Sequence, residues 1–241
     1  MQKNELKAWQ NLTKVLRHEI MNSMTPIASL ANSLGTILEE DLEEIDAKLM
    51  INKDSYLDLS VGLETISKRS VGLVDFVNAY RDYTNIPSPK IKRVALEKRF
   101  ENICILMKEE LAKSSIGLET KIQPPGLEII ADQEMVQMIL INLIKNGREA
   151  MDKAKNRTIL LHADNDQHGH PYIQVTDHGE GIVPEAIERI FVPFFTTKKT
   201  GSGIGLAISR QIMNLHQGSL EVASIPGERT IFTLFFGPAK G

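Results

Sequence analysis

Apolar residues recur at spacings of three and four along the first part of the chain, which is the period of one face of an α-helix. A helix over residues 4–38 would extend about 50 Å at 1.5 Å per residue. One small globule cannot cover a helix of that length, so the pattern predicts a helical bundle or a coiled coil. The apolar positions are Leu6, Trp9, Leu12, Leu16, Ile20, Met24, Ile27, Leu30 and Leu34.

A second helical pattern follows, and the prolines of "NIPSPK" (85–90) end it. Between the two patterns, residues 35–57 are acidic and weakly periodic, and we interpret them as the solvated tip of a helical hairpin. Two helices alone bury little apolar surface, so we expect residues 1–88 to be a dimerisation hairpin that forms a four-helix bundle in a homodimer. The second apolar series is Leu59, Leu63, Ile66, Leu73, Val77 and Tyr80.

Residues 89–241 alternate between short β-rich segments and helical segments, which is typical of an α/β domain. This alternation predicts an α/β sandwich in which helices cover one face of a mixed sheet. The fold class of the whole chain is therefore α + α/β. The expected strands are "KIKRVAL", "LETKIQ", "LEIIAD", "TILLHAD", "YIQVTD", "SLEVAS" and "TIFTLFF", and the expected helices cover 97–114, 133–154 and 203–216.

Composition argues against several classes of function. A net charge of -3 gives no basic footprint for phosphate, so nucleic acid is not an expected partner. A single cysteine, Cys104, excludes an internal disulfide framework and a cysteine-rich zinc site, and it fits the reducing cytosol. No window approaches the roughly 18 apolar residues of a membrane helix. We expect a cytoplasmic protein that meets a membrane only through a region upstream of this sequence.

Two glycine-rich segments favour a nucleotide site. In "DHGEGI" (177–182) a strand ends at Asp177, and Gly179 and Gly181 allow a tight turn that holds the carboxylate where an exocyclic amine such as that of adenine can donate to it. Alone, this segment is weak evidence, because a turn between strands explains such a motif more often. In "TGSGIGLAISR" (200–210) three glycines lead directly into a helix, an arrangement that presents backbone N–H groups to phosphate. A Rossmann site is disfavoured because its glycines follow the first strand of a βαβ unit.

The segment "NLIKNGREAM" (142–151) places Asn142 and Asn146 four residues apart, so both amides project from one face of a helix. Such amides can simply cap a turn or satisfy buried backbone groups. Beside the two glycine motifs, they favour oxygen ligation of Mg²⁺. This ion needs only one or two protein groups, because phosphates and water complete its octahedron.

Together these segments resemble the catalytic core of two-component sensor histidine kinases. "RHEIMNSMTPI" is similar to the H box of that family, "NLIKNGREAM" to its N box, "DHGEGI" to its first glycine box, "IFVPFFTTK" to its F box and "GSGIGLAISR" to its second glycine box. The resemblance implies a dimerising hairpin that carries a phospho-accepting histidine, followed by an ATP-binding domain of the Bergerat type (89–241). It also implies ATP and Mg²⁺ as ligands and a response-regulator receiver domain as partner.

In the H box, the resemblance makes His18 the phosphate acceptor and Glu19 its general base. Independently, His18 lies two residues from both Leu16 and Ile20, about 200° around the helix from each, so it points away from the apolar stripe. Asn22, one turn further on, is implied as the group that positions water when the partner is dephosphorylated. Pro26 is expected to bend the helix.

In the second domain, the resemblance implies roles for the nucleotide-binding residues. Asn146 would coordinate Mg²⁺, Asn142 would lie near the phosphates and Asp177 would bind adenine. Lys198 would add a charge-assisted contact and Thr230 a water-mediated one near adenine. Residues 191–205 are expected to form a lid that nucleotide orders. The glycines divide into Gly179 and Gly181, which would shape the base pocket, and Gly201, Gly203 and Gly205, which would contact the phosphates.

The leading hypothesis is therefore ATP-dependent autophosphorylation of His18 and transfer of the phosphoryl group to an aspartate of a response regulator, with phosphatase activity toward that regulator as a possible addition. One alternative is a scaffold or phosphatase that binds nucleotide and regulates a partner through the hairpin, which the intact H box disfavours. A second alternative is a stand-alone ATPase. Relatives that hydrolyse ATP carry a water-activating glutamate at the first N-box position, where this chain has Asn142.

Overall fold

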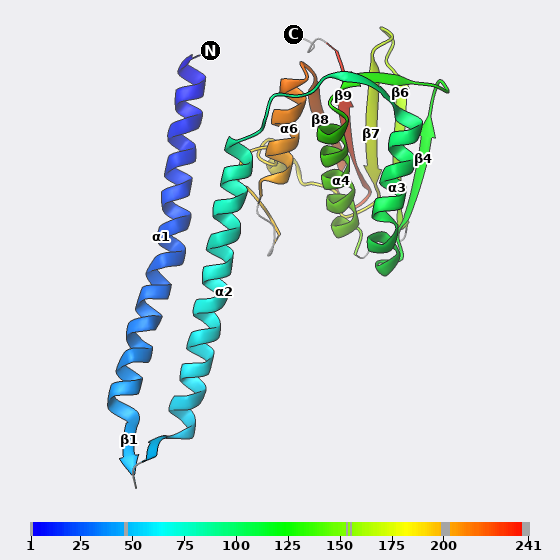
Figure 1. The fold of residues 1–241 in the computed structure, drawn as a ribbon. Helices are drawn as coiled ribbons and strands as arrows, with labels where there is room; N and C mark the ends of the chain where they lie inside the picture. The colour runs from blue at the N-terminus through cyan, green and yellow to red at the C-terminus, as the bar shows by residue number, and fades with distance from the viewer. Residues whose placement is uncertain (1, 46–47, 153, 155, 199–202, 238–241) are drawn as a thin grey trace. The chain divides into compact units, whose positions relative to one another are not determined.

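The computed structural model describes residues 2–45, 48–152, 154, 156–198 and 203–237, with the backbone alone for 2–19, 43–45, 48–49, 79 and 82 (Figure 1). The chain divides into two compact units, Met1–Asp82 and Tyr83–Gly241. No described helix is long and apolar enough to cross a membrane. Each unit is described separately below.

The first unit is a helical hairpin, as predicted. Helix α1 (Gln2–Asp41) runs through Pro26 and is followed by a short antiparallel ribbon of β1 (Leu42–Ile45) and β2 (Lys48–Ile51). Helix α2 (Lys53–Thr84) then returns along α1 (Figure 1). The ribbon was not predicted, because four-residue strands are too short to establish an alternating pattern.

Local hydrogen bonds fix the start of α2. Asn52 is its N-cap, since the Oδ1 atom of Asn52 accepts from the backbone N–H of Ser55 at 2.8 Å. The hydroxyl of Ser55 in turn donates to the carboxylate of Asp41 at the end of α1, at 2.6 Å. The turn between the ribbon and α2 is thereby tied to the last residue of α1.

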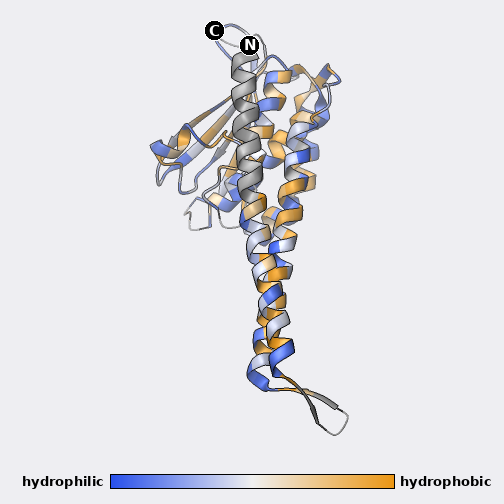
Figure 2. Cartoon of the chain, turned by 90° about the vertical axis from the view of Figure 1, so that its left-hand side faces the viewer, coloured by the Kyte–Doolittle hydropathy of each residue, from blue (hydrophilic) through white to orange (hydrophobic). Residues whose placement is uncertain are grey.

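The hairpin leaves many apolar side chains uncovered. Leu34 of α1 is buried against Gly62 of α2, where the missing side chain lets the two helices approach. Other apolar residues are solvent-exposed within the single chain, and Figure 2 shows hydrophobic residues along both helices. They are Met21, Met24 and Leu38 of α1, and Leu57, Val61, Leu63, Val71, Val74 and Val77 of α2.

The second unit is built on a five-stranded mixed sheet of order β4-β6-β7-β9-β8. The β4–β6 pair is parallel and the other pairs are antiparallel. Strands β3 (Lys92–Ala95) and β5 (Glu128–Ala131), both predicted, form a separate two-stranded ribbon. The main strands are β4 (Gly117–Ile122), β6 (Thr158–Asn165), β7 (Pro171–Asp177), β8 (Ser219–Ile225) and β9 (Arg229–Phe235).

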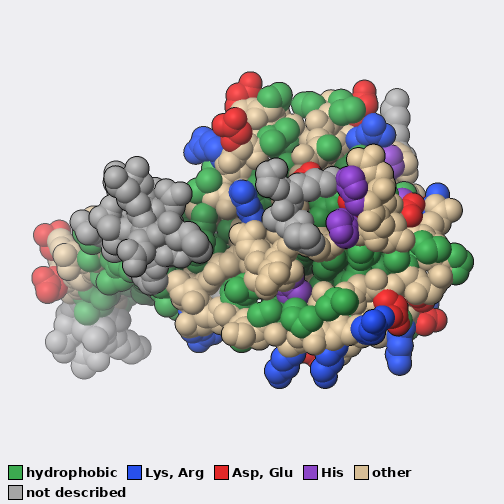
Figure 3. Space-filling model, turned by 90° about the horizontal axis from the view of Figure 1, so that it is seen from above, with side chains coloured by type: hydrophobic (Ala, Val, Ile, Leu, Met, Phe, Trp, Pro, Cys, Tyr) green, Lys and Arg blue, Asp and Glu red, His purple; other side chains and the backbone are tan. Residues whose placement is uncertain are grey.

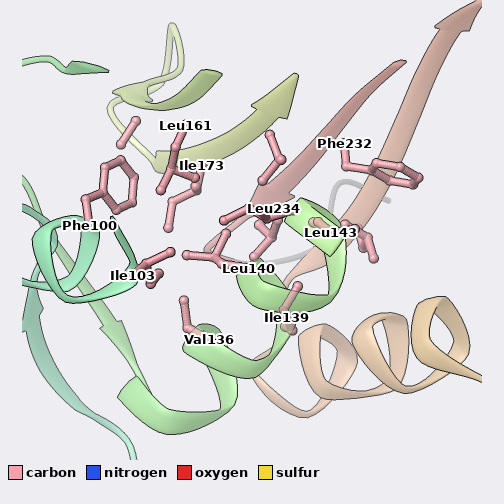
Figure 4. Close-up of a cluster of buried hydrophobic side chains, with 14 of the residues drawn as sticks. Phe100, Ile103, Val136, Ile139, Leu140, Leu143, Leu161, Ile173, Phe232 and Leu234 are labelled. Atoms are coloured by element: carbon pink, nitrogen blue, oxygen red, sulfur yellow. The ribbon is translucent and has the colours of Figure 1, made fainter. Parts of the chain in front are cut away.

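Helices α3 (Leu96–Lys113), α4 (Gln133–Ala150) and α6 (Gly205–Leu215) cover one face of this sheet (Figure 1). Alternate residues of the strands point to them, so Ile159 and Leu161 of β6 are fully buried between less buried neighbours. Figure 4 shows side chains of α3 and α4 meeting those of β6, β7 and β9 in one core. The predicted fold class is confirmed. A short helix α5 (Pro184–Ile187) was not predicted.

Asp132 organises the start of α4. Its Oδ1 atom accepts from the N–H groups of Glu134 and Met135, and its Oδ2 atom accepts from the N–H of Lys90 at 2.7 Å. Its own N–H donates to Nε2 of His216, whose other ring nitrogen lies 2.8 Å from the carbonyl oxygen of Ile212, so the neutral tautomer with hydrogen on Nδ1 satisfies both contacts.

The pKa of Asp132 lies below its ordinary value of 3.8, because the three backbone N–H groups outweigh the effect of burial, which alone would raise it.

On this basis Asp132→Asn should lower the free energy of unfolding at pH 7 by about 1–2 kcal/mol. The NH₂ group of the amide cannot accept from the N–H of Lys90, and the neutral side chain lacks the negative charge that favours the start of α4. Because the folded-state pKa is depressed, this stabilisation is present above pH 3.8 and is lost as the pH falls through the folded-state pKa. Urea denaturation between pH 7 and pH 3 measures it. The exposed Glu119→Gln is the control, and a difference independent of pH would contradict this role of the charge.

Candidate functional site

Sheet register brings Asp177 and Thr230 together. Strand β7 ends at Asp177, which pairs with Thr230 of β9, and the two residues are 4% and 3% exposed. The Oδ1 atom of Asp177 accepts from the N–H of Gly179 at 3.0 Å. The Thr230 hydroxyl lies 3.0 Å from that of Ser224 on β8. Burial raises the pKa of Asp177 above its ordinary value, against the opposing effects of the Gly179 N–H and the nearby His178 and Lys198.

Two glycines let α4 approach this carboxylate. A side chain at Gly147 would place Cβ 3.0 Å from Cβ of Asp177, and one at Gly179 would place Cβ 2.6 Å from the carbonyl oxygen of Ala150. The last turn of α4 therefore packs directly on the end of β7. Sequence reasoning missed Gly147. A signal was available, because glycine inside a helix costs about 1 kcal/mol relative to alanine and is kept there for a reason such as close packing.

Gly181 packs on the turn between β8 and β9. It has a positive φ of 69°, and an added Cβ would lie 2.5 Å from the carbonyl oxygen of Ile225. Two hydrogen bonds hold the same turn: the N–H of Ile182 donates to Ser224 Oγ at 2.8 Å, and the N–H of Gly227 donates to the carbonyl of Glu180 at 2.8 Å. The segment that follows Asp177 is thus fixed by backbone contacts on both sides.

A cavity of about 600 Å³ adjoins this segment. Residues of α4 and of the turn after it line one part, and residues next to Asp177 and in the β8–β9 turn line the rest. The lining residues are Glu149, Ala150, Asp152, Ala154, Asn156, His178, Gly179, Glu180, Gly227 and Glu228. Figure 3 shows acidic and basic side chains interspersed on the face it views.

Asn142 ties α4 to the start of α6. Its Nδ2 atom donates to the hydroxyl of Ser209 at 3.0 Å, and that hydroxyl donates to the carbonyl oxygen of Gly205 at 2.8 Å. Gly205 lies against the amide of Asn142, where a side chain would overlap the amide oxygen. Asn142, the first position of the N box, therefore contacts Gly205 of the second glycine box, although the two residues are 63 positions apart in the sequence.

Asn146 and Lys198 are also brought together. The Nζ atom of Lys198 donates to Oδ1 of Asn146 at 3.0 Å and to Oε2 of Glu149 at 2.5 Å. Gly203 has a φ of +68°, and its carbonyl oxygen accepts from the N–H of Phe194 at 2.9 Å. Gly201 lies outside the described residues, as does part of the segment predicted to be a lid.

The H-box residues lie on α1, in the other unit. Residues 18 and 19 are helical, but their side chains lie outside the described part of the structure. Asn22 is exposed on the same helix, one turn further on. The structure thus gathers the predicted nucleotide-binding residues that it describes on α4, β7, β9 and α6 of the second unit, whereas the predicted acceptor belongs to the first unit.

Comparison with known proteins agrees with this arrangement. Residues 131–240 match the family of histidine kinase-, DNA gyrase B- and HSP90-like ATPases. Over 240 residues the chain is 26% identical to the sensor histidine kinase ZraS of Klebsiella oxytoca, covering 99% of this chain and 48% of ZraS. The solved catalytic domain of histidine kinase ThkA matches with a TM-score of 0.55 and 26% identity, over 62% of this chain and 97% of that domain. The chain has the catalytic core of a sensor histidine kinase.

The likeness of fold extends over both units of this histidine kinase core. The structure of ThkA in complex with response regulator protein TrrA matches 99% of this chain and 65% of that chain, with a TM-score of 0.64 and 22% identity. At that identity the match establishes the fold alone. The kinase core spans between a third and a half of the length of the curated relatives it matches.

Burial of Asp177 gives a prediction about stability. Asp177→Asn should raise the free energy of unfolding at pH 7, because the amide keeps the bond from Gly179 and removes a buried charge. The raised folded-state pKa means that the wild type loses stability as the pH rises through that pKa, so the advantage of the variant should vanish near pH 3.8 and below. Thermal unfolding at several pH values measures it, and a less stable variant at pH 7 would contradict it.

Gly181 gives a second prediction. Gly181→Ala should destabilise the protein more than Gly169→Ala, although both glycines have positive φ values, 69° and 80°. The control at Gly169 has open space around its Cβ and should cost about 1–2 kcal/mol from backbone strain alone. Gly181→Ala adds an overlap with the backbone of Ile225. Urea denaturation compares the two variants, and equal losses would show that the close approach is not needed.

Proposed function

We propose that this chain catalyses transfer of the γ-phosphoryl group of ATP to His18 and then to an aspartate of a response regulator. The observation that carries the proposal is the buried Asp177 beneath Gly147 of the N-box helix, in a unit whose sequence matches an ATPase family. A buried carboxylate suits the exocyclic amine of adenine. Gly179, Gly181 and Thr230 would complete the base pocket.

The phosphates would bind at the other end of this region, between α4 and the segment that leads into α6. Asn142, Lys198 and the glycines at 201, 203 and 205 would surround them, with backbone N–H groups as donors. Asn146 would hold Mg²⁺, and its Oδ1 atom already accepts from a cation, the ammonium of Lys198, which supports this fit. When bound, Mg²⁺ would neutralise charge on the phosphates and polarise the γ-phosphorus.

Asn142 supports phosphoryl transfer over hydrolysis. Its amide donates to Ser209 and has no basicity with which to activate water, whereas the ATP-hydrolysing relatives carry a glutamate at this position. The productive acceptor is then a protein nucleophile. One imidazole nitrogen of His18 would attack the γ-phosphorus while Glu19 takes the proton from the other, and ADP would leave. Transfer to an aspartate carboxylate of the regulator would restore the imidazole.

The hairpin would supply the partner surfaces. The exposed apolar residues of α1 and α2 support a homodimer in which two hairpins form a four-helix bundle. The ThkA structure contains response regulator protein TrrA, which supports a receiver domain as partner here. Asn22, exposed one turn beyond His18, would position water for phosphatase activity toward that partner. Because it consumes ATP, we assign the core to the cytoplasm. It would reach a membrane only through another region.

The test is incubation of the purified chain with Mg²⁺ and γ-labelled ATP. Acid-labile, base-stable protein label should appear in the wild type and vanish in His18→Gln, because a phosphohistidine has that stability and the variant lacks the nucleophile. The exposed Glu119→Gln should label like the wild type. Label that persists in His18→Gln would contradict the assignment of the acceptor. Nucleotide binding without any label would favour a scaffold or phosphatase acting through Glu19 and Asn22.

A further inference from the structure

Two oxygen atoms of α4 converge on one cation. Asn146 and Glu149 are three residues apart and therefore share a face of the helix. The Nζ atom of Lys198 lies 3.0 Å from Oδ1 of Asn146 and 2.5 Å from Oε2 of Glu149. An ammonium has no lone pair to offer, so both oxygens act purely as acceptors toward positive charge. Both oxygens are thus held on one helix and face the same positive charge.

Among the residues that the structure describes, Glu149 has no comparable partner on its other side. Its second contact is with Nη2 of Arg148 at 3.5 Å, whereas Arg148 makes a 2.7 Å ion pair with Glu110. The side chains of Lys198 and Glu149 are 39% and 44% exposed. An ion pair so exposed contributes about 0–1 kcal/mol, so another cation can replace the ammonium at little cost.

We propose that Glu149 is a second protein oxygen of the metal site and that the Lys198 ammonium occupies this position while the site holds no nucleotide. This inference rests on the proposed function, in which Asn146 binds Mg²⁺ together with ATP. Mg²⁺ is commonly bound through one or two carboxylates plus substrate phosphates. Entry of the metal releases Lys198, which lies just before the glycines assigned to the phosphates, to contact the phosphates instead.

The charge of Glu149 makes nucleotide binding depend on the metal. Without a divalent ion between them, the carboxylate repels the triphosphate, and release of Lys198 leaves that carboxylate unpaired. With Mg²⁺ between them, the same carboxylate attracts the complex. Removing the charge therefore has opposite effects on the binding of ATP with and without the metal.

The experiment is calorimetric titration of ATP into the full chain at a series of Mg²⁺ concentrations and in EDTA. Glu149→Gln should raise the Mg²⁺ concentration for half-maximal ATP binding about tenfold, as loss of a metal-site group commonly does. In EDTA this variant should bind ATP more tightly than the wild type. The matched control is Glu134→Gln, an exposed glutamate in the first turn of the same helix, which should leave both values unchanged.

A second measurement tests the ammonium, with Mn²⁺ alone as probe and no nucleotide present. Lys198→Gln should bind Mn²⁺ more tightly than the wild type, because the competing cation is gone, and Glu149→Gln should bind it more weakly. If the wild type and Glu149→Gln need the same Mg²⁺ concentration for half-maximal ATP binding, the inference about Glu149 is overturned. The proposed function would still stand, because the wild type binds ATP. A wild type that binds no ATP at any Mg²⁺ concentration would overturn both.

Discussion

The contact between Gly147 and Asp177 is the constraint on which the geometry of the second unit depends. Because Gly147 has no side chain, the last turn of α4 lies directly on the carboxylate that ends β7. That contact fixes where the neighbouring Asn146 and Glu149 project, and it places Ala150 against Gly179. An alanine at position 147 would already bring its Cβ to 3.0 Å from Cβ of Asp177, so the helix or the strand would have to shift. The residues proposed for the base pocket and for the metal share this support.

Helix α4 has an aspartate at each end, and the two carboxylates have opposite environments. Asp132 caps the N-terminus, where three N–H groups favour its charge and hold its pKa low. Asp177 lies against the last turn, where burial disfavours its charge and raises its pKa. The first carboxylate stabilises the fold. The second is costly to the fold, an environment that fits the binding role proposed for it.

The residues assigned to the proposed phosphoryl transfer are divided between the two units. The H box lies on α1, whereas the described residues that we propose bind nucleotide lie on α4, β7, β9 and α6 and the segments beside them. Phosphoryl transfer to His18, as proposed, would therefore involve residues of both units.

The sequence by itself determined the hairpin, nearly all strands and helices and the one-sided sheet, because period and turn chemistry are local properties. It also predicted the family, because the motifs are contiguous runs. Only the tertiary structure decided that β3 and β5 form a separate ribbon, that Thr230 pairs with Asp177, that Gly147 touches that carboxylate and that Lys198 reaches Asn146 and Glu149. These contacts join residues far apart in the chain, and their register depends on how the whole core packs, which no local pattern encodes.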